Sequence, residues 1–243
     1  MSLIESSATG GATYSLTVAA EQATKPAEIA PERFSSLEHP SYQLSGHTGA
    51  VNAFTWSNNG NMFATGGKDG RILLWDTFPS PVNMELIDAH SNQILDLTYS
   101  HDDTLLLSGG ADSRGFLWDV ETRECVQEML HRSDVTSVAA NGRGGHVFAT
   151  TTEEGTCWIW DTRQKAPTDR LDTRYPLNSV CLSSDGTIVY TAGVGEVIHV
   201  WDMRQGKVLH TLRGHSDTIT GLALSKDGST LVSNSCDNSV RTW

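Results

Sequence analysis

The chain has 243 residues, enough for one all-β domain, and its 22 glycines suit a fold of many short strands and tight turns. Its 29 acidic and 17 basic side chains give a net charge of −12, which argues against a broad electrostatic contact with nucleic acid or anionic lipid. The sequence shows no long apolar run and no apolar h-region near residue 1, so neither a membrane span nor secretion is expected. The four cysteines lack C-x-x-C spacing, so reduced thiols and a cytosolic or nuclear protein are expected.

The first part of the chain, residues 1–41, differs from the rest. Met1–Ala30 is rich in Ser, Thr, Ala and Gly and has few large apolar residues, which predicts a disordered N-terminal arm. Pro31–Tyr42 carries apolar side chains among Pro and Ser and is expected to form a short ordered strap. The folded domain is therefore predicted to span residues 42–243.

Within that domain a tryptophan recurs at intervals of 43, 42, 41 and 42 residues, at Trp75, Trp118, Trp160, Trp201 and Trp243. A period of this length indicates one supersecondary unit repeated five times. The first four tryptophans are each followed by Asp. Turn signals such as Asn58-Asn59-Gly60 and Lys226-Asp227-Gly228 are typical of hairpins, and helix-period segments are absent, so an all-β fold is predicted.

The units are predicted to share one plan of short strands, with a fourth strand expected in the first four of them. The apolar first strands are expected at Val51–Trp56, Ile94–Tyr99, Val135–Ala140, Leu177–Leu182 and Ile219–Leu224. The second strands are expected to end at a hydroxyl residue ten positions before the tryptophan, namely Thr65, Ser108, Thr150, Thr191 and Ser233. The third strand ends in the tryptophan. The fourth strands are expected around Met84–Asp88, Cys125–Leu130, Thr168–Leu171 and Val208–Leu212.

A histidine, the hydroxyl residue, an acid and the tryptophan recur in the same order in four units. The indole N–H needs an acceptor, the hydroxyl can accept it and donate to the histidine, and the acid can hold the second ring nitrogen. The predicted tetrads are His47, Thr65, Asp69 and Trp75; His90, Ser108, Asp112 and Trp118; His131, Thr150, Glu154 and Trp160; and His215, Ser233, Asp237 and Trp243.

The same residue types occur in hydrolase triads and in metal sites. A catalytic set occurs once in a chain, whereas this set recurs with each tryptophan, so a structural role is expected. We therefore predict no enzyme activity, no metal site and no cofactor. The fourth unit has Thr173 and Gly195 in place of the histidine and the acid. Either this unit has drifted, or the loops around Asp172–Pro176 and Gly193–Glu196 are free to contact a partner.

Two units end in Trp-Asp-x-Arg, with the arginines at Arg163 and Arg204. Each arginine is expected either to neutralise acidic side chains at the turn or to contact a partner protein. The second interpretation comes from a resemblance to substrate receptors of cullin-RING ubiquitin ligases, in which such an arginine contacts the adaptor.

The period, the head histidine and the tail Trp-Asp resemble the WD40 family, whose fold is a β-propeller. The stretch LRGHSDTITGLALSKDGSTLVSNSCDNSVRTW at Leu212–Trp243 and the stretch GHTGAVNAF within Ser45–Asp76 are similar to the WD-repeat subunits of the U5 small nuclear ribonucleoprotein. This resemblance implies a non-catalytic platform for protein partners in the spliceosome, docked on the large scaffold protein of the U5 particle. It also implies a nuclear location, with the cytoplasm as a second compartment.

Direct contact with nucleic acid, a membrane or a small-molecule substrate is not expected. A generic WD40 signalling scaffold and the ligase receptor remain as alternatives. The resemblance further implies seven blades, whereas this chain has five repeats. An open arc of five-sevenths of a propeller is therefore expected, with two unpaired end faces. A truncated gene model, a fragment, or a divergent protein completed by another subunit would each account for the difference.

Overall fold

The structure, a computed structural model, describes residues 44–77, 82–142 and 146–243, with side chains for all of these except 82–87. The chain divides into two units, Met1–Tyr42 and Gln43–Trp243, and only the second falls within the described residues. The predicted N-terminal arm and strap lie outside them. In the described part there is no helix, and therefore none that is long and apolar enough to cross a membrane.

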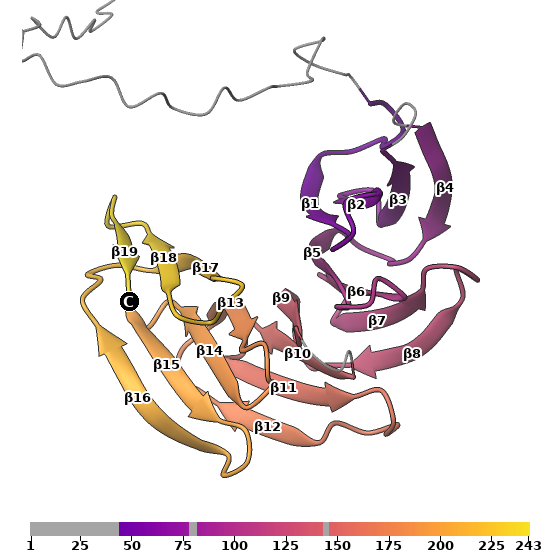
Figure 1. Ribbon diagram of the computed structural model, residues 1–243. Coiled ribbons are helices and arrows are strands. Elements are labelled where there is room, and N and C mark those ends of the chain that lie inside the picture. Colours follow the sequence, from indigo (N-terminus) through magenta and orange to yellow (C-terminus); the bar gives the residue numbers. More distant parts are fainter. Residues whose placement is uncertain (1–43, 78–81, 143–145) are drawn as a thin grey trace, which may run out of the picture. The chain divides into compact units, whose positions relative to one another are not determined.

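The described residues form five antiparallel sheets, which we call blades one to five (Figure 1). Blade one contains β1 (Val51–Trp56), β2 (Met62–Gly67), β3 (Arg71–Asp76) and β4 (Val82–Asp88). Blade two contains β5 (Ile94–Tyr99), β6 (Leu105–Gly110), β7 (Arg114–Asp119) and β8 (Cys125–Leu130). Blade three contains β9 (Val135–Ala140), β10 (Val147–Thr152), β11 (Thr156–Asp161) and β12 (Asp169–Asp172). Blade four contains β13 (Leu177–Leu182), β14 (Ile188–Gly193), β15 (Val197–Asp202) and β16 (Lys207–Arg213). Blade five contains β17 (Ile219–Leu224), β18 (Leu231–Ser235) and β19 (Val240–Thr242).

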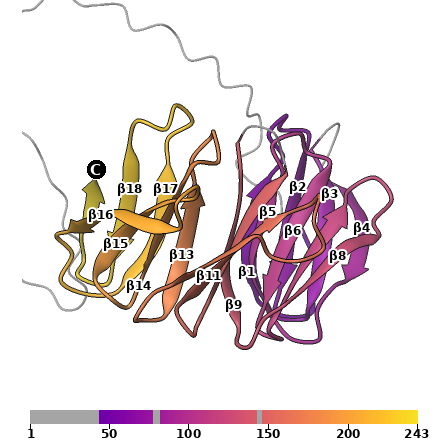
Figure 2. The same ribbon diagram turned by 90° about the horizontal axis from the view of Figure 1, so that it is seen from below.

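Consecutive strands are neighbours in every sheet, so each blade is a simple meander. The predicted bounds of all five first strands are confirmed. Figure 2 shows the sheets of the successive blades following one another in chain order, from β1–β4 to β17 and β18. This is the five-bladed arrangement of a β-propeller, and it confirms the all-β prediction.

The prediction for the ends of the second strands was wrong by two residues, because the ladder continues past the hydroxyl residue. In blade one, Gly66 and Gly67 still pair with β1. Glycine is a weak signal for strand, but here it meets a packing need. A Cβ built on Gly66 would lie 2.6 Å from Cγ2 of Ile94 in the next blade, so only glycine lets the two blades approach this closely.

Blades are joined through apolar faces. We call the side of each sheet that carries the first and fourth residues of its first strand the first face, and the opposite side the second face. Ile94 and Leu97 on the first face of blade two pack against Ala64, Ile72 and Leu74 on the second face of blade one. Equivalent clusters join blades two and three, three and four, and four and five. Burial of these side chains supplies most of the stabilisation that a single blade lacks.

Side chains of the first strands add hydrogen bonds across the same interfaces. Asn52 Nδ2 donates to the carbonyl of Ile94 at 2.9 Å, as the second residue of β1. Thr136 Oγ1 donates to the carbonyl of Leu177 at 2.7 Å from the same position of β9. Asn178 of β13 repeats the contact with Ile219 at 3.2 Å. The donor therefore recurs at one strand position and always reaches the first residue of the next blade.

Blade two has Leu95 at the donor position and forms its polar contacts with blade three through another residue. Its neighbour Asp96 accepts hydrogen bonds from Ser137 Oγ at 2.7 Å and from the backbone N–H of Val138 at 2.9 Å. Burial raises the pKa of the Asp96 carboxyl above its ordinary value, and the two donors oppose that rise.

We expect Thr136→Val to lower the free energy of unfolding by about 1–2 kcal/mol, because the shape is kept while the buried carbonyl of Leu177 loses its donor. Thr220→Val is the matched control, since Thr220 occupies the same position in blade five, where it is exposed. The control is expected to change stability by less than about 0.5 kcal/mol. Urea unfolding of both variants checks this; equal effects would contradict a role at the interface.

Candidate functional site

The structure brings together the predicted tetrads of blades one, two and five. In blade one, Trp75 Nε1 donates to Thr65 Oγ1 at 2.9 Å, and Thr65 Oγ1 lies 2.8 Å from His47 Nε2. His47 Nδ1 lies 3.0 Å from Asp69 Oδ1. Since the hydroxyl hydrogen is then free for Nε2, Nδ1 carries the ring proton and donates it to the carboxylate.

The other two complete tetrads repeat this geometry. Trp118 donates to Ser108 at 3.0 Å, and His90 lies 2.8 Å from Ser108 and 2.9 Å from Asp112. Trp243 donates to Ser233 at 2.9 Å, and His215 lies 2.8 Å from Ser233 and 2.7 Å from Asp237. The histidine side chains in these blades are buried. Each hydroxyl, imidazole and carboxylate is thus engaged within its own blade.

The aspartates also hold the turns around them. Asp69 accepts the backbone N–H of Thr48, three residues before the start of β1, at 2.8 Å, and the N–H of Arg71 at 3.3 Å. Burial raises the pKa of Asp69, but the hydrogen bonds from Thr48 and His47 outweigh it and hold the pKa below its ordinary value. For His90, burial lowers the pKa, and Asp112 only partly offsets this.

Blade three departs from the prediction. Trp160 Nε1 donates to Thr150 Oγ1 at 3.0 Å, and Thr150 lies 3.3 Å from His131 Nε2. Among the described residues, His131 Nδ1 is buried and has no hydrogen-bond partner. Glu154 is exposed, and its backbone N–H donates to Ser133 Oγ at 3.2 Å. The expectation that Glu154 completes this tetrad was therefore wrong.

Side-chain length explains the difference. Glu153 N–H donates to the carbonyl of Asp134, as Lys68 N–H donates to that of Ala50, so Glu154 occupies the backbone position of Asp69. The extra methylene of glutamate carries its carboxylate out of the turn. Burial without a charged partner lowers the pKa of His131 to about 4.

Blade four keeps only part of the network. Trp201 Nε1 donates to Thr191 Oγ1 at 2.9 Å, while Thr173, in the histidine position, lies 2.6 Å from the carbonyl of Gly155. The ring of Tyr175 covers Gly195, where a Cβ would approach it to 2.9 Å. Tyr175 and Val194 nevertheless remain exposed. A partner contact by these two loops stays a prediction.

The two Trp-Asp-x-Arg arginines differ in their surroundings. Arg163 Nε donates to Asp161 Oδ1 at 2.8 Å, so its guanidinium is paired within its own motif. Arg204 is exposed, and its backbone N–H donates to Asp202 Oδ1 at 2.7 Å. Adaptor binding by either arginine stays a prediction. The described residues contain no group of three or more His, Cys, Asp or Glu that could hold a metal ion.

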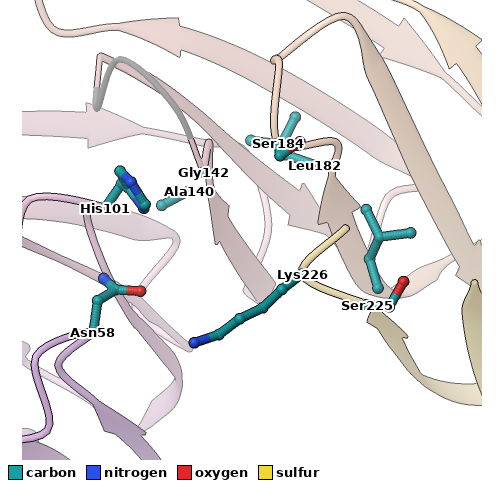
Figure 3. A pocket seen from close by; sticks show the side chains of 9 residues that line it. Asn58, His101, Ala140, Gly142, Leu182, Ser184, Ser225 and Lys226 are labelled. Atoms are coloured by element: carbon teal, nitrogen blue, oxygen red, sulfur yellow. The ribbon is translucent and has the colours of Figure 1, made fainter. Parts of the chain in front are cut away.

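The first hairpin turns contribute a shallow hollow of about 540 Å³, shown in Figure 3. All five blades line it, through Asn58, His101, Ala140, Gly142, Leu182, Ser184, Leu224, Ser225 and Lys226. It is not enclosed and offers an amide, an imidazole, hydroxyls and a cation, which suits contact with a polypeptide surface more than enclosure of a small ligand. These residues were not predicted, because the residue types at these equivalent turn positions differ from blade to blade. The turn signals at Asn58 and Lys226 were the available clue.

We expect Glu154→Asp to stabilise the protein by about 1 kcal/mol, because the shorter carboxylate can accept the proton of His131 Nδ1. The matched control is Asp112→Glu in blade two, which removes the partner of His90 and is expected to destabilise by a similar amount. Urea unfolding measures both. If both substitutions changed the free energy of unfolding in the same direction, this account of the turn would be contradicted.

The depressed pKa of His131 also predicts a pH dependence. Between pH 6.5, the ordinary pKa of histidine, and about pH 4, His131 is protonated in the unfolded chain but neutral in the folded protein. Stability is therefore expected to fall as the pH drops through this window, by on the order of 3 kcal/mol from this group. Glu154→Asp should reduce the fall, since it raises the pKa of His131. If stability fell equally with pH in the unsubstituted protein and in Glu154→Asp, the assignment of this effect to His131 would be refuted.

Comparison with known proteins places these five blades in a family. The family model for the WD domain, G-beta repeat, matches residues 38–76, 82–119, 123–161, 170–202 and 206–243. The U5 small nuclear ribonucleoprotein 40 kDa protein of Homo sapiens is 41% identical over 212 residues, which cover 86% of this chain and 59% of that protein. The protein of the same name from Dictyostelium discoideum is 35% identical over 189 residues, covering 77% of this chain and 53% of that protein.

Pre-mRNA-splicing factor cwf17 of Schizosaccharomyces pombe is 34% identical over 190 residues, covering 78% of this chain and 56% of that protein. The chain thus spans somewhat more than half the length of these relatives. The repeat match extends over most of the chain and coincides with the five observed sheets. The chain belongs to the WD40 repeat family.

Proposed function

We propose that this protein is a non-catalytic interaction scaffold of the U5 small nuclear ribonucleoprotein and acts in pre-mRNA splicing. The observation that carries the proposal is the 41% identity over 86% of the chain to a protein named as a U5 subunit. The similarity to a named pre-mRNA-splicing factor of a yeast supports the same process. Nuclear location follows from this proposal, because splicing takes place there.

The geometry supports a scaffold more than an enzyme. The residues that could form a catalytic set, such as His47 and Asp69, are held by the tryptophan network of their own blade. A hydroxyl that accepts an indole N–H and points at a buried imidazole has no access to a substrate. The exposed polar groups instead lie on turns, where propellers present side chains to other proteins.

Protein partners fit the charge of the surface better than RNA. The net charge of −12 disfavours a direct grip on a phosphate backbone. We therefore propose contacts with the large scaffold protein of the U5 particle and its other protein components. The hollow at the first hairpin turns is our candidate contact surface, because all five blades contribute to it and Lys226 extends into it (Figure 3).

Purification of the tagged chain from cells is expected to recover U5 proteins together with the U5 RNA. Lys226→Glu should reduce that recovery severalfold, because it reverses the charge in the hollow. The matched control is Lys165→Glu, which makes the same charge change at an exposed position on the β11–β12 connection. Failure of a folded, tagged chain to recover any splicing protein would contradict the function. Equal recovery of U5 components by the two variants would contradict the assignment of the hollow as the contact surface.

The same purification tests the competing function of a ubiquitin-ligase receptor. That function predicts recovery of a ligase adaptor, and its loss in a protein with both Arg163→Ala and Arg204→Ala. The scaffold function predicts that U5 components are still recovered with this double variant. Recovery of an adaptor without U5 components would contradict the scaffold function, and recovery of U5 components without an adaptor would contradict the receptor function.

A further inference from the structure

Two loops at one end of blade four expose large apolar side chains. The loops are residues 173–176, between β12 and β13, and residues 194–196, between β14 and β15. They carry Tyr175, which is 49% exposed, and Val194, which is 43% exposed. Blade four packs against blade three on one face and against blade five on the other, so these side chains are exposed at the loop end of a blade whose faces are covered.

The equivalent positions of the other blades carry different residue types. Tyr175 stands two residues after the histidine position, where the other blades have Gly49, Asn92, Ser133 and Asp217. Val194 stands seven residues before the tryptophan, where the other blades have Lys68, Ala111, Glu153 and Cys236. At these positions, an aromatic and a branched aliphatic side chain occur together in blade four and in no other blade that the structure describes.

The residues that replace the histidine and the acid of the tetrad hold these loops together. The hydroxyl of Thr173 lies 2.8 Å from the carbonyl of Tyr175 and fixes the backbone there. The ring of Tyr175 covers Gly195, where a side chain would collide with it. The N–H of Val194 donates to the carbonyl of Pro176 at 3.0 Å. The apolar surface is therefore fixed by contacts within the blade.

Three carboxylates stand next to this apolar surface. Glu153 and Glu154 lie on the β10–β11 turn of blade three, which contacts the first loop: a Cβ built on Gly155 would lie 2.5 Å from the carbonyl of Tyr175. Glu196 ends the second loop. All three glutamates are exposed, and within the described part of the chain none of them forms an ion pair.

The positive charges nearby are fewer. Arg174 of the first loop is exposed, and the loop before β9 contributes one charge of each sign, from Arg132 and Asp134. Asp172 is already paired, since Arg170 Nε donates to its carboxylate at 2.7 Å. The two loops and the adjoining turn therefore combine an apolar centre with a net negative charge.

We propose that this surface, made of Tyr175, Val194, Glu153, Glu154 and Glu196, binds an extended protein segment in which a lysine or arginine stands beside an aliphatic or aromatic residue. The apolar side chain packs on Val194 and Tyr175. The cation lies among the carboxylates and against the tyrosine ring. The preformed loops keep the entropic cost of binding low.

The proposal does not depend on the splicing function. Its surface also differs from the hollow at the first hairpin turns. In an antiparallel meander, the turn between the first and second strands lies at the opposite end from the turn between the second and third. A protein segment on the blade-four loops therefore leaves that hollow free for another partner.

Selection of phage-displayed random short peptides on the full chain tests the chemistry of the partner. Peptides enriched on the unsubstituted chain, but not on a variant with Tyr175→Ala and Val194→Ser, are expected to carry Lys or Arg beside an apolar residue. Both replaced side chains are exposed, and urea unfolding checks that the variant is folded. Enrichment of acidic peptides, enrichment of the same peptides on both proteins, or no enrichment at all would overturn the proposal.

Fluorescence anisotropy with one enriched, labelled peptide tests the role of the carboxylates. A variant with Glu153→Lys and Glu196→Lys is expected to bind about tenfold more weakly, because two exposed attractions become repulsions. The matched control, Glu121→Lys with Glu124→Lys, makes the same charge change at exposed positions on the β7–β8 connection and should bind like the unsubstituted chain. An equal loss in both variants would overturn the proposal, because net charge rather than this surface would then hold the peptide.

Discussion

The packing of one blade's first face on the second face of the blade before it is the contact on which the rest of the structure depends. A single antiparallel meander of four strands has two apolar faces and cannot bury either alone. The close approach at Gly66 and the donor at Asn178 both serve this contact. Stability is therefore a property of neighbouring blades, and among the described residues blades one and five each pack against one other blade.

The tetrads act within this framework rather than in place of it. They tie the turn at the head of a blade to its second and third strands, and the tryptophan also packs in the interface with the preceding blade, as Trp118 and Trp201 do. The incomplete networks lie in blades three and four, which are covered on both faces. These are the blades with the unpartnered Nδ1 of His131 and with Thr173 in the histidine position.

Much of the fold could be predicted from the period of the repeats. The five first strands carry apolar residues at their first, fourth and sixth positions, and this shared pattern allowed them to be located to the residue. The ends of the second strands were not, because the ladder continues through Gly66 and Gly67, and glycine signals a turn as readily as a close approach. The role of Glu154 was predicted wrongly because a sequence pattern treats Asp and Glu alike, whereas the glutamate side chain is one methylene longer. The hollow at the hairpin turns was missed because its lining residues occupy equivalent positions in the five blades but differ in type.

Hydrogen–deuterium exchange along the first strands tests the central claim most directly, because it measures protection blade by blade. The account predicts strong protection of β5, β9 and β13, which are covered by blades on both sides, and weaker protection of β1 and β17 in dilute solution. Equal protection of all five strands under those conditions would contradict it, since stability would then not come from the contacts between blades.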